Sequence, residues 1–351
     1  MTANTTTPTY WLNWRVLLCA IWVLISMVLA SILIWKYEGT GNLKPDRREN
    51  QQETAGSLYE DEAWMPCLKE IHPAWLLAFR IMAFFVLLAL LIVNVIVEGV
   101  DIFYFYTQWT FTLVTIYFGL GSLLSIYGCY KYRNRVDGDK VDQVGLDAER
   151  GTYVAPPLGG NANISKMGKS LDSLEHHVRK TAGIWGYVFQ VIFQMNAGAV
   201  MLTDCVFWFL IVPFLTIEDY NLNFLIISMH SINAFFLLGD MALNCLRFPW
   251  FRIAYFALWT AIFVIFQWIV HAFVSIWWPY PILDLSSSYA PIWYLSVALM
   301  QIPCYGVFAL IMTMKRFLLS RWFPQSYRIL RGAANEQHRK EMSRDNNLWK
   351  M

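Results

Sequence analysis

The stretch WLLAFRIMAFFVLLALLIVNVIV, from Trp75 to Val97, decides the fold class. It is 23 residues long and carries one charge, that of Arg80. A helix needs roughly 20 mostly apolar residues to cross the ~30 Å hydrocarbon core of a bilayer, so this stretch predicts a transmembrane helix. The whole chain has a matching composition. Of its 351 residues, 57% are hydrophobic and 15% are charged, whereas soluble chains average roughly 25% charged residues.

Six further stretches have similar length and composition, so the sequence predicts an all-α polytopic bundle of seven transmembrane spans. The expected spans are Val16–Trp35, Trp75–Val97, Thr107–Tyr130, Trp185–Ile217, Phe224–Leu246, Ile253–Trp277 and Pro291–Met314. The first could instead be a signal peptide. Its apolar run of about 20 residues exceeds the usual 7–15 of a signal core, which favours a retained helix.

Lysine and arginine are distributed very unevenly between alternate loops. One side of the membrane holds Arg15 and the loops 98–106, 218–223 and 278–290, and these three loops contain no basic residue. The other side holds 25 of the 27 basic residues, and Arg80 inside a span completes the count. Loops rich in basic residues stay in the cytoplasm. The chain is therefore expected to have its N-terminus outside and its C-terminus in the cytoplasm, in a plasma membrane or an endomembrane.

The span pattern divides the chain into three regions. Residues 1–74 are expected to hold the N-terminal tail, the first helix and an acidic cytoplasmic loop. Residues 75–314 form a six-helix membrane core with a long flexible cytoplasmic loop at 131–184, and residues 315–351 form a basic cytoplasmic tail.

The charge and the cysteines narrow the classes of partner. A net charge of +2 does not favour nucleic-acid binding. The six cysteines are scattered without a C-x-x-C pair, so they indicate neither a disulfide framework nor a metal site. We expect membrane lipids as partners, with no cofactor, no metal and no nucleic acid. The sequence identifies no protein partner.

Polar side chains within spans are costly and suggest function. Asn233, Asp240 and Asn244 lie at positions i, i+7 and i+11, so the last two each lie within about 20° of Asn233 at ~100° per residue. We therefore expect one polar stripe facing the bundle. Buried polar groups of this kind can also serve only as hydrogen-bond partners between helices, each worth about 0.6 kcal/mol on average.

Depth links three other polar groups. At a rise of 1.5 Å per residue, His230, His271 and the threonines of Thr110–Thr115 all lie roughly 5–12 Å below the outer surface. A hydroxyl group and imidazoles at one level would suit a nucleophile and a general base that act on lipid. Transport is a further alternative, for which Asp204 and Asp240 are the natural ion carriers.

Three short motifs resemble the androgen-induced gene / Rolling stone-like family of membrane proteins. The motifs are Tyr106-Thr107-Gln108-Trp109-Thr110-Phe111, Met229-His230-Ser231-Ile232-Asn233 with Asp240 downstream, and Trp268-Ile269-Val270-His271 with Trp277 and Tyr280-Pro281. The resemblance covers roughly residues 75–314. It implies a core of about six spans and, for some members, hydrolysis of fatty-acid esters by an intramembrane threonine and histidine. At the position of the family threonine this chain has Leu113, and Thr112 is the neighbouring hydroxyl.

These observations give one sharp hypothesis and two alternatives. In the sharp hypothesis the protein hydrolyses a fatty-acid ester within the membrane, with Thr112 as nucleophile and His230 as general base. Thr110 and Thr115 are alternative nucleophiles. The expected polar network around this pair comprises His271, Asn233, Asp240 and Asn244. The first alternative is a non-enzymatic membrane protein with a structural or partner-binding role, and the second is a transporter or receptor.

Overall fold

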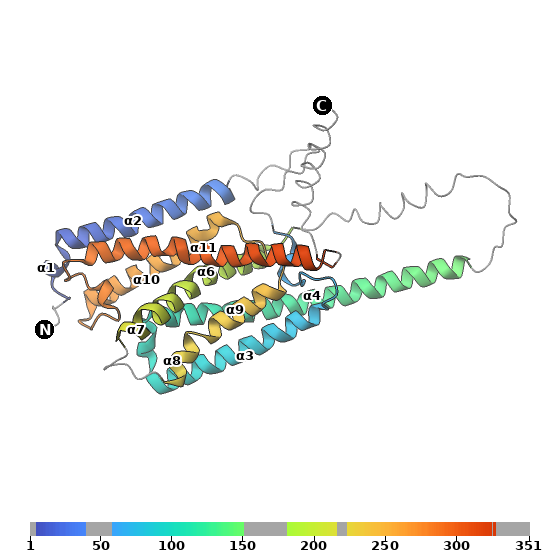
Figure 1. The fold of residues 1–351 in the computed structure, drawn as a ribbon, viewed down its shortest axis with the longest axis horizontal. Coiled ribbons are helices and arrows are strands. Elements are labelled where there is room, and N and C mark those ends of the chain that lie inside the picture. Colours follow the sequence, from blue (N-terminus) through green and yellow to red (C-terminus); the bar gives the residue numbers. More distant parts are fainter. Residues whose placement is uncertain (1–4, 40–57, 151–180, 216–222, 325, 328–351) are drawn as a thin grey trace, which may run out of the picture.

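The computed structural model describes residues 5–39, 58–150, 181–215, 223–324 and 326–327, and no strand occurs among them. Seven helical segments in these residues are long and apolar enough to cross a membrane, as predicted. They are Trp14–Glu38, Pro73–Glu98, Tyr106–Asn134, Ile184–Phe209, Phe224–Leu243, Trp250–Phe273 and Ala290–Trp322. The chain is a multi-pass membrane helix bundle (Figure 1).

Six of the seven spans are built on one long helix each. These helices are α2 (Trp14–Ile34), α3 (Pro73–Glu98), α4 (Tyr106–Arg150), α6 (Ile184–Val206), α10 (Ile253–Phe273) and α11 (Ala290–Trp322). The remaining span consists of α8 (Phe224–Met229) and α9 (Ile232–Leu243), which are separated by a break at His230 and Ser231. The backbone of His230 leaves the helical region there, with φ −104° and ψ 13°.

The helices run alternately between two ends of the bundle. At one end α2 and α11 begin and α10 stops (Figure 1), and we call it the outer end because the basic residues predict that orientation. The opposite end is the inner end. At the outer end Tyr10, in the short helix α1 (Pro8–Trp11), donates to Asp284 Oδ1 at 3.0 Å. Arg15 donates to the carbonyl of Ser286 at 2.6 Å. The N-terminal segment is thus attached to the loop that follows α10.

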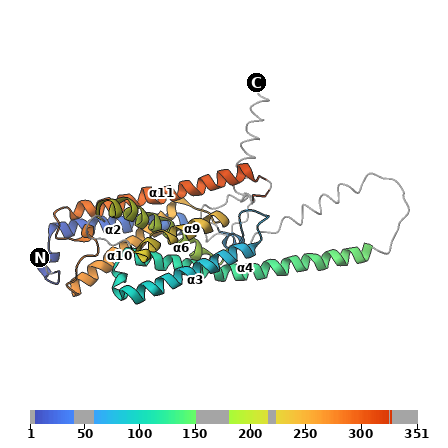
Figure 2. The same cartoon turned by 60° about the horizontal axis from the view of Figure 1, so that its bottom comes forward.

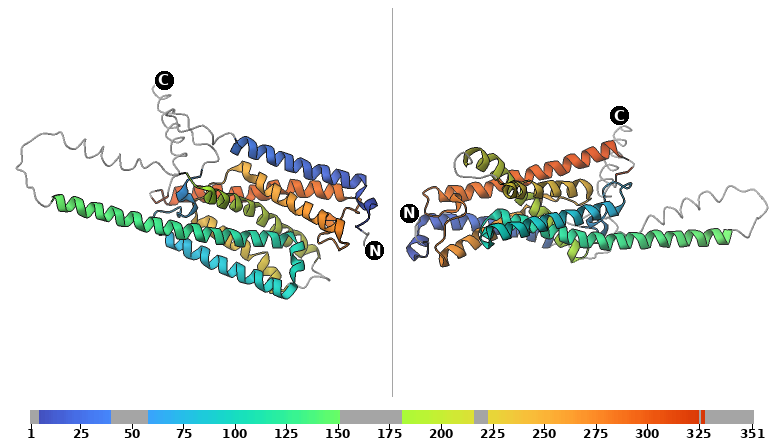
Figure 3. Two further views of the ribbon diagram at one scale, coloured as in Figure 1. Left: turned by 180° about the vertical axis from the view of Figure 1, so that it is seen from behind. Right: turned by 90° about the horizontal axis from the view of Figure 1, so that it is seen from below.

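Helix α6 lies at the centre of the bundle. It packs against α4, α10 and α11, whereas α3 packs against α4, and α2 packs against α10 and α11. Figure 2 and the left view of Figure 3 show α3 and α4 on one side and α2, α10 and α11 on the other. Between α4 and α6 the rings of Tyr117 and Phe189 stack with centroids 4.6 Å apart. Between α6 and α10, Phe256 lies directly against Gly198, which has no side chain to obstruct it.

Two helices extend beyond the spans that hydropathy predicts. Helix α4 continues to Arg150, so residues 131–150 of the loop predicted at 131–184 are helical (Figure 3). Helix α11 continues to Trp322, into the predicted tail. The helices outlast the predicted spans because hydropathy marks where a helix leaves the hydrocarbon, whereas lysine, arginine and glutamate remain good helix formers in water. The rest of the predicted loop, residues 151–180, lies outside the described part of the chain.

Two other helices end earlier than predicted. Helix α9 stops at Leu243 instead of Leu246, because Asn244 is extended (φ −74°, ψ 164°) and its side chain accepts a hydrogen bond from the backbone of Leu246 at 3.2 Å. An asparagine side chain commonly satisfies nearby backbone in this way where a helix gives way to a turn. Helix α10 stops at Phe273 instead of Trp277, where Val274 turns to an extended conformation.

Candidate functional site

His230 lies at the break between α8 and α9, six residues after the start of α8 at the outer end. Its carbonyl oxygen accepts a hydrogen bond from Trp208 Nε1 at 2.9 Å. Its ring stacks on Phe207, with centroids 3.8 Å apart and an interplanar angle of 2°. Phe207 and Trp208 belong to the π-helical turn Phe207–Ile211 that follows α6, and such turns are frequent at functional sites. A helix break and a π-helical turn together hold this imidazole.

Asp204 of α6 is the acidic neighbour of His230. Its Oδ1 lies 3.6 Å from His230 Nδ1, and both side chains are largely buried, with 14% and 11% exposed. Thr203 donates to the same carboxylate oxygen at 3.3 Å. A carboxylate beside one ring nitrogen favours the tautomer that keeps the proton there, which leaves Nε2 as the basic atom. At 3.6 Å the contact is longer than a hydrogen bond, so the structure places a carboxylate beside the imidazole without a hydrogen bond between them.

Several polar atoms around this pair have no hydrogen-bond partner in the described residues. They are Asp204 Oδ2, His230 Nδ1 and Asn233 Nδ2. Asn233 is fully buried, and its Oδ1 accepts from the backbone of Ala234 at 2.8 Å. Buried polar atoms without partners are rare because each costs free energy. Because the side chains of His230 and Asn233 lie beside Asp204, these atoms can bond either one another or a polar group of a ligand.

The three candidate threonines of α4 have different environments. The hydroxyl of Thr115 donates to the carbonyl of Phe111 at 2.9 Å, so it is engaged with its own helix. Thr110 is fully buried, and its hydroxyl has no partner by hydrogen-bond geometry among the described residues. Thr112 is half-buried as a residue, and its hydroxyl oxygen, which is itself buried, also lacks a partner in the described residues. Of the three, Thr112 combines an unengaged hydroxyl with a side chain that is not fully enclosed.

Thr112 lies near the helix that carries Asp204. Asn196 of α6 donates to the carbonyl of Leu113 at 3.4 Å, and the Oδ1 of Asn196 has no partner in the described chain. No hydrogen bond among the described residues joins Thr112 to His230. The structure thus places the predicted nucleophile on a helix that packs against α6, without a direct contact between the two predicted catalytic groups.

His271 occupies a different environment from His230. Its Nδ1 lies 2.7 Å from the carbonyl of Gln267, and its ring stacks on Trp278 with centroids 3.6 Å apart. Its Nε2 is buried without a partner in the described residues. The shared depth expected for the two histidines does not bring them into one hydrogen-bonded group.

Asp240 and Asn244 belong to a third polar group, toward the inner end of α9. Asp240 accepts hydrogen bonds from Arg80 Nε at 2.6 Å, from Asn244 Nδ2 at 2.7 Å and from the hydroxyl of Tyr117. Arg80 also donates to Ser125 Oγ at 2.8 Å. Arg80 and Asp240 are completely enclosed. Asn233 of the predicted stripe instead lies beside Asp204, whereas Asp240 and Asn244 share this network.

The sequence hypothesis did not include Arg80 or Asp204 among its site residues. An arginine inside an apolar span signals a buried acidic partner, because a lone charge there is costly. The partner, Asp240, is 160 positions away on another helix. Residue spacing within one helix therefore does not predict the pair. Near the inner end a second such pair joins Arg252 Nε to Glu38 Oε1 at 2.7 Å.

No group of three or more histidine, cysteine, aspartate or glutamate side chains suited to a metal ion occurs in the described residues. Comparison of the chain with protein-family models, with curated proteins and with solved structures finds no match.

Proposed function

We propose that this multi-pass membrane protein is an intramembrane hydrolase of lipid esters, with His230 as general base, Asp204 as its orienting group and Thr112 as nucleophile. The observation that supports the proposal most is the Asp204–His230 pair, with its 3.6 Å separation and its unpartnered polar atoms near the outer end. The three motifs that resemble the androgen-induced gene / Rolling stone-like family favour the same reaction. A fatty-acid ester is the proposed substrate.

In the proposed reaction Thr112 Oγ1 attacks the ester carbonyl as its proton passes to His230 Nε2. The bond between the acyl carbon and the alcohol oxygen then breaks, and His230 returns the proton to the leaving alcohol. A water molecule next attacks the acyl-threonine and loses a proton to Nε2, and that proton restores the Thr112 hydroxyl as the fatty acid leaves. Asn196 and Asn233 each have one buried polar atom without a partner in the described residues, and Asn233 Nδ2 is suited to donate to the carbonyl oxygen.

A fluorophosphonate probe on purified protein in lipid nanodiscs tests the proposal. The wild type is expected to be labelled, and Thr112→Val and His230→Gln are expected to lose labelling by about 10²-fold or more, as for the loss of a nucleophile or a general base. Thr115→Val is the matched threonine control because its hydroxyl bonds only its own helix. His72→Gln, at an exposed position before α3, is the histidine control.

The variant Asp204→Asn tests whether Asp204 positions His230 or only supports folding of the protein. It is expected to lower the labelling rate and to move its pH profile while the protein stays monodisperse. Labelling that survives Thr112→Val and His230→Gln contradicts the proposed pair. Absence of labelling in the wild type, together with no release of fatty acid from ester substrates, contradicts hydrolysis.

A non-enzymatic structural role is the second candidate, and the Arg80–Asp240 network favours it. In that network Asp240 accepts hydrogen bonds from three side chains. The network is therefore more typical of a structural connection between helices than of a ligand-binding site. Under this alternative, Thr112→Val and His230→Gln leave every biochemical property of the protein unchanged except stability.

A further inference from the structure

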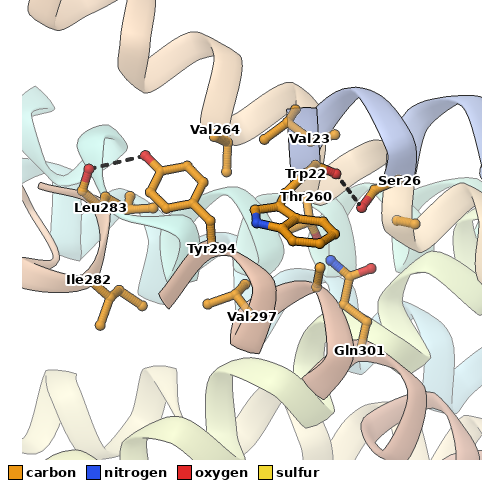
Figure 4. A pocket seen from close by; sticks show the side chains of 13 residues that line it. Trp22, Val23, Ser26, Thr260, Val264, Ile282, Leu283, Tyr294, Val297 and Gln301 are labelled. Atoms are coloured by element: carbon orange, nitrogen blue, oxygen red, sulfur yellow. Dashed lines mark hydrogen bonds between the residues drawn. The ribbon is translucent and has the colours of Figure 1, made fainter. Parts of the chain in front are cut away.

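A crevice opens on the side of the bundle formed by α2, α10 and α11, away from the polar groups described above. Its cavity volume is about 40 Å³, and its mouth is open. A space of that size accepts the polar end of a ligand, and the rest of the molecule would lie in the open mouth. Figure 4 shows Trp22 and Val23 of α2 on one side, Val264 of α10 above, and Tyr294, Val297 and Gln301 of α11 on the other side. Leu283 and Ile282 close the outer end.

The lining of this crevice suits an uncharged hydrocarbon. None of the thirteen described residues that line it is charged, and most are apolar. A charged head group would lose its hydration there without gaining an ionic partner, which is costly in hydrocarbon. The crevice thus discriminates against ordinary phospholipid head groups and favours a neutral lipid.

Three hydroxyl groups in the lining are already engaged by the protein. Ser26 donates to the carbonyl of Trp22 at 2.9 Å, and Tyr294 donates to the carbonyl of Leu283 at 3.1 Å (Figure 4). Thr260 donates to the carbonyl of Phe256 at 3.1 Å and lies 3.0 Å from the hydroxyl of Tyr106. These three hydroxyl groups make the crevice partly polar, but their protons already form hydrogen bonds within the protein and are not available to a ligand.

Gln301 is the exception. Its side chain is 7% exposed, and Figure 4 shows its amide turned into the crevice toward Thr260 and Trp22. No hydrogen bond to this amide occurs among the described residues. Gln301 lies eleven residues after Ala290, about 17 Å along α11 at 1.5 Å per residue, which is near the middle of a ~30 Å hydrocarbon core. Bulk water does not reach that depth, so the partner is either an ordered buried water or a molecule dissolved in the membrane.

We propose that this crevice binds an uncharged lipid alcohol, with the hydrocarbon body along α2 and α10 and the hydroxyl group at Gln301. A hydroxyl both donates and accepts, so it satisfies the amide NH₂ and the amide oxygen of Gln301 together, which neither an alkane nor a simple carbonyl does. The site lies on other helices than Asp204 and His230 and does not depend on the proposed hydrolysis.

A pair of photoactivatable probes tests the proposal: a long-chain alcohol that carries a diazirine, and the matched alkane without the hydroxyl. Purified full-length protein in nanodiscs is exposed to each probe, and crosslinked peptides are identified. We expect the alcohol to crosslink α2, α10 or α11 at the crevice and to be displaced by unlabelled alcohol. Gln301→Leu should weaken that displacement about fivefold, as expected for the loss of one hydrogen bond. Crosslinking by the alkane should not change.

Two tryptophan variants supply the matched control. Ala298→Trp fills the crevice and should abolish crosslinking by both probes at this place. Leu299→Trp puts the same side chain on the neighbouring exposed position and should leave crosslinking intact. The proposal is overturned if alcohol and alkane crosslink the crevice equally and Gln301→Leu has no effect. It is also overturned if Ala298→Trp is monodisperse and still crosslinks at this place.

Discussion

Arg80 donates to both carboxylate oxygens of Asp240, at 2.6 Å and 3.3 Å, and both side chains are completely enclosed within the bundle. The pair joins α3 to α9, two helices that are also in contact through the rings of Phe79 and Phe236. A buried ion pair need not stabilise a fold more than an apolar pair of similar volume, but a single buried charge without its partner is strongly destabilising. The two residues should therefore tolerate joint replacement better than replacement of either one.

A double-mutant cycle measures this coupling. Arg80→Met alone leaves Asp240 as an uncompensated buried carboxylate, so the free energy of unfolding should fall by about 3–5 kcal/mol. Asp240→Leu alone should have a loss of similar size. The double variant should lose less than the sum of the two, with a coupling energy of about 0.5–3 kcal/mol. Thermal unfolding of detergent-solubilised protein provides the measurement. If the losses in free energy of unfolding for the two single variants simply add up in the double variant, the pairing of Arg80 with Asp240 is contradicted.

Two helical glycines should respond oppositely to alanine. A Cβ at Gly198 of α6 would lie 2.3 Å from the ring of Phe256 on α10, so Gly198→Ala should destabilise by about 1–3 kcal/mol through overpacking. Gly306 of α11 has open space around the same position, and Gly306→Ala should be neutral or stabilise by up to about 1 kcal/mol through better helix propensity. The midpoints of thermal unfolding should therefore move in opposite directions, and equal shifts would contradict the close approach of α6 and α10.

Much of the fold follows from hydropathy alone, because a span needs only sufficient length and few charges. Trp75–Val97, for example, is predicted as a span and is found within α3. Hydropathy does not predict where α4 and α9 end. A charged residue such as Lys131 does not stop a helix, and Asn244 ends α9 through a local hydrogen bond. The sequence also does not predict which side chains meet at the candidate site. Asp204 and His230 meet only because two irregular turns on different helices face each other.

Tyr10 should make the stability of the protein sensitive to alkaline pH. Partial burial, followed by the charge of Asp284 and the hydrogen bond to it, raises the pKa of Tyr10 above its ordinary value. In the unfolded chain tyrosine loses its proton near pH ~10, whereas in the folded chain it keeps it to higher pH. The contribution of Tyr10 is thus complete below pH ~10 and declines as the pH rises from there toward the folded-state pKa.

The substitution Tyr10→Phe tests this pH dependence. Below pH ~9 it should cost about 0.5–1.5 kcal/mol, the value of one hydrogen bond. At higher pH the difference from the wild type should shrink, because the phenylalanine has no proton to lose. Thermal unfolding midpoints measured between pH 8 and pH 11 provide the comparison. A difference that grows with pH would contradict a raised pKa.

The orientation in the membrane can be tested with two single cysteines at exposed positions outside the spans. Asp101 lies in the short loop between α3 and α4 at the outer end, and Lys69 lies before α3 at the inner end. Because the basic residues predict that the inner end faces the cytoplasm, Asp101→Cys should react with an impermeant maleimide in intact cells. Lys69→Cys should react only after permeabilisation. The wild type gives the background from the native cysteines, of which Cys19, Cys67, Cys245 and Cys304 are buried. The reverse pattern would invert the predicted topology and would move the Asp204–His230 pair to the cytoplasmic leaflet.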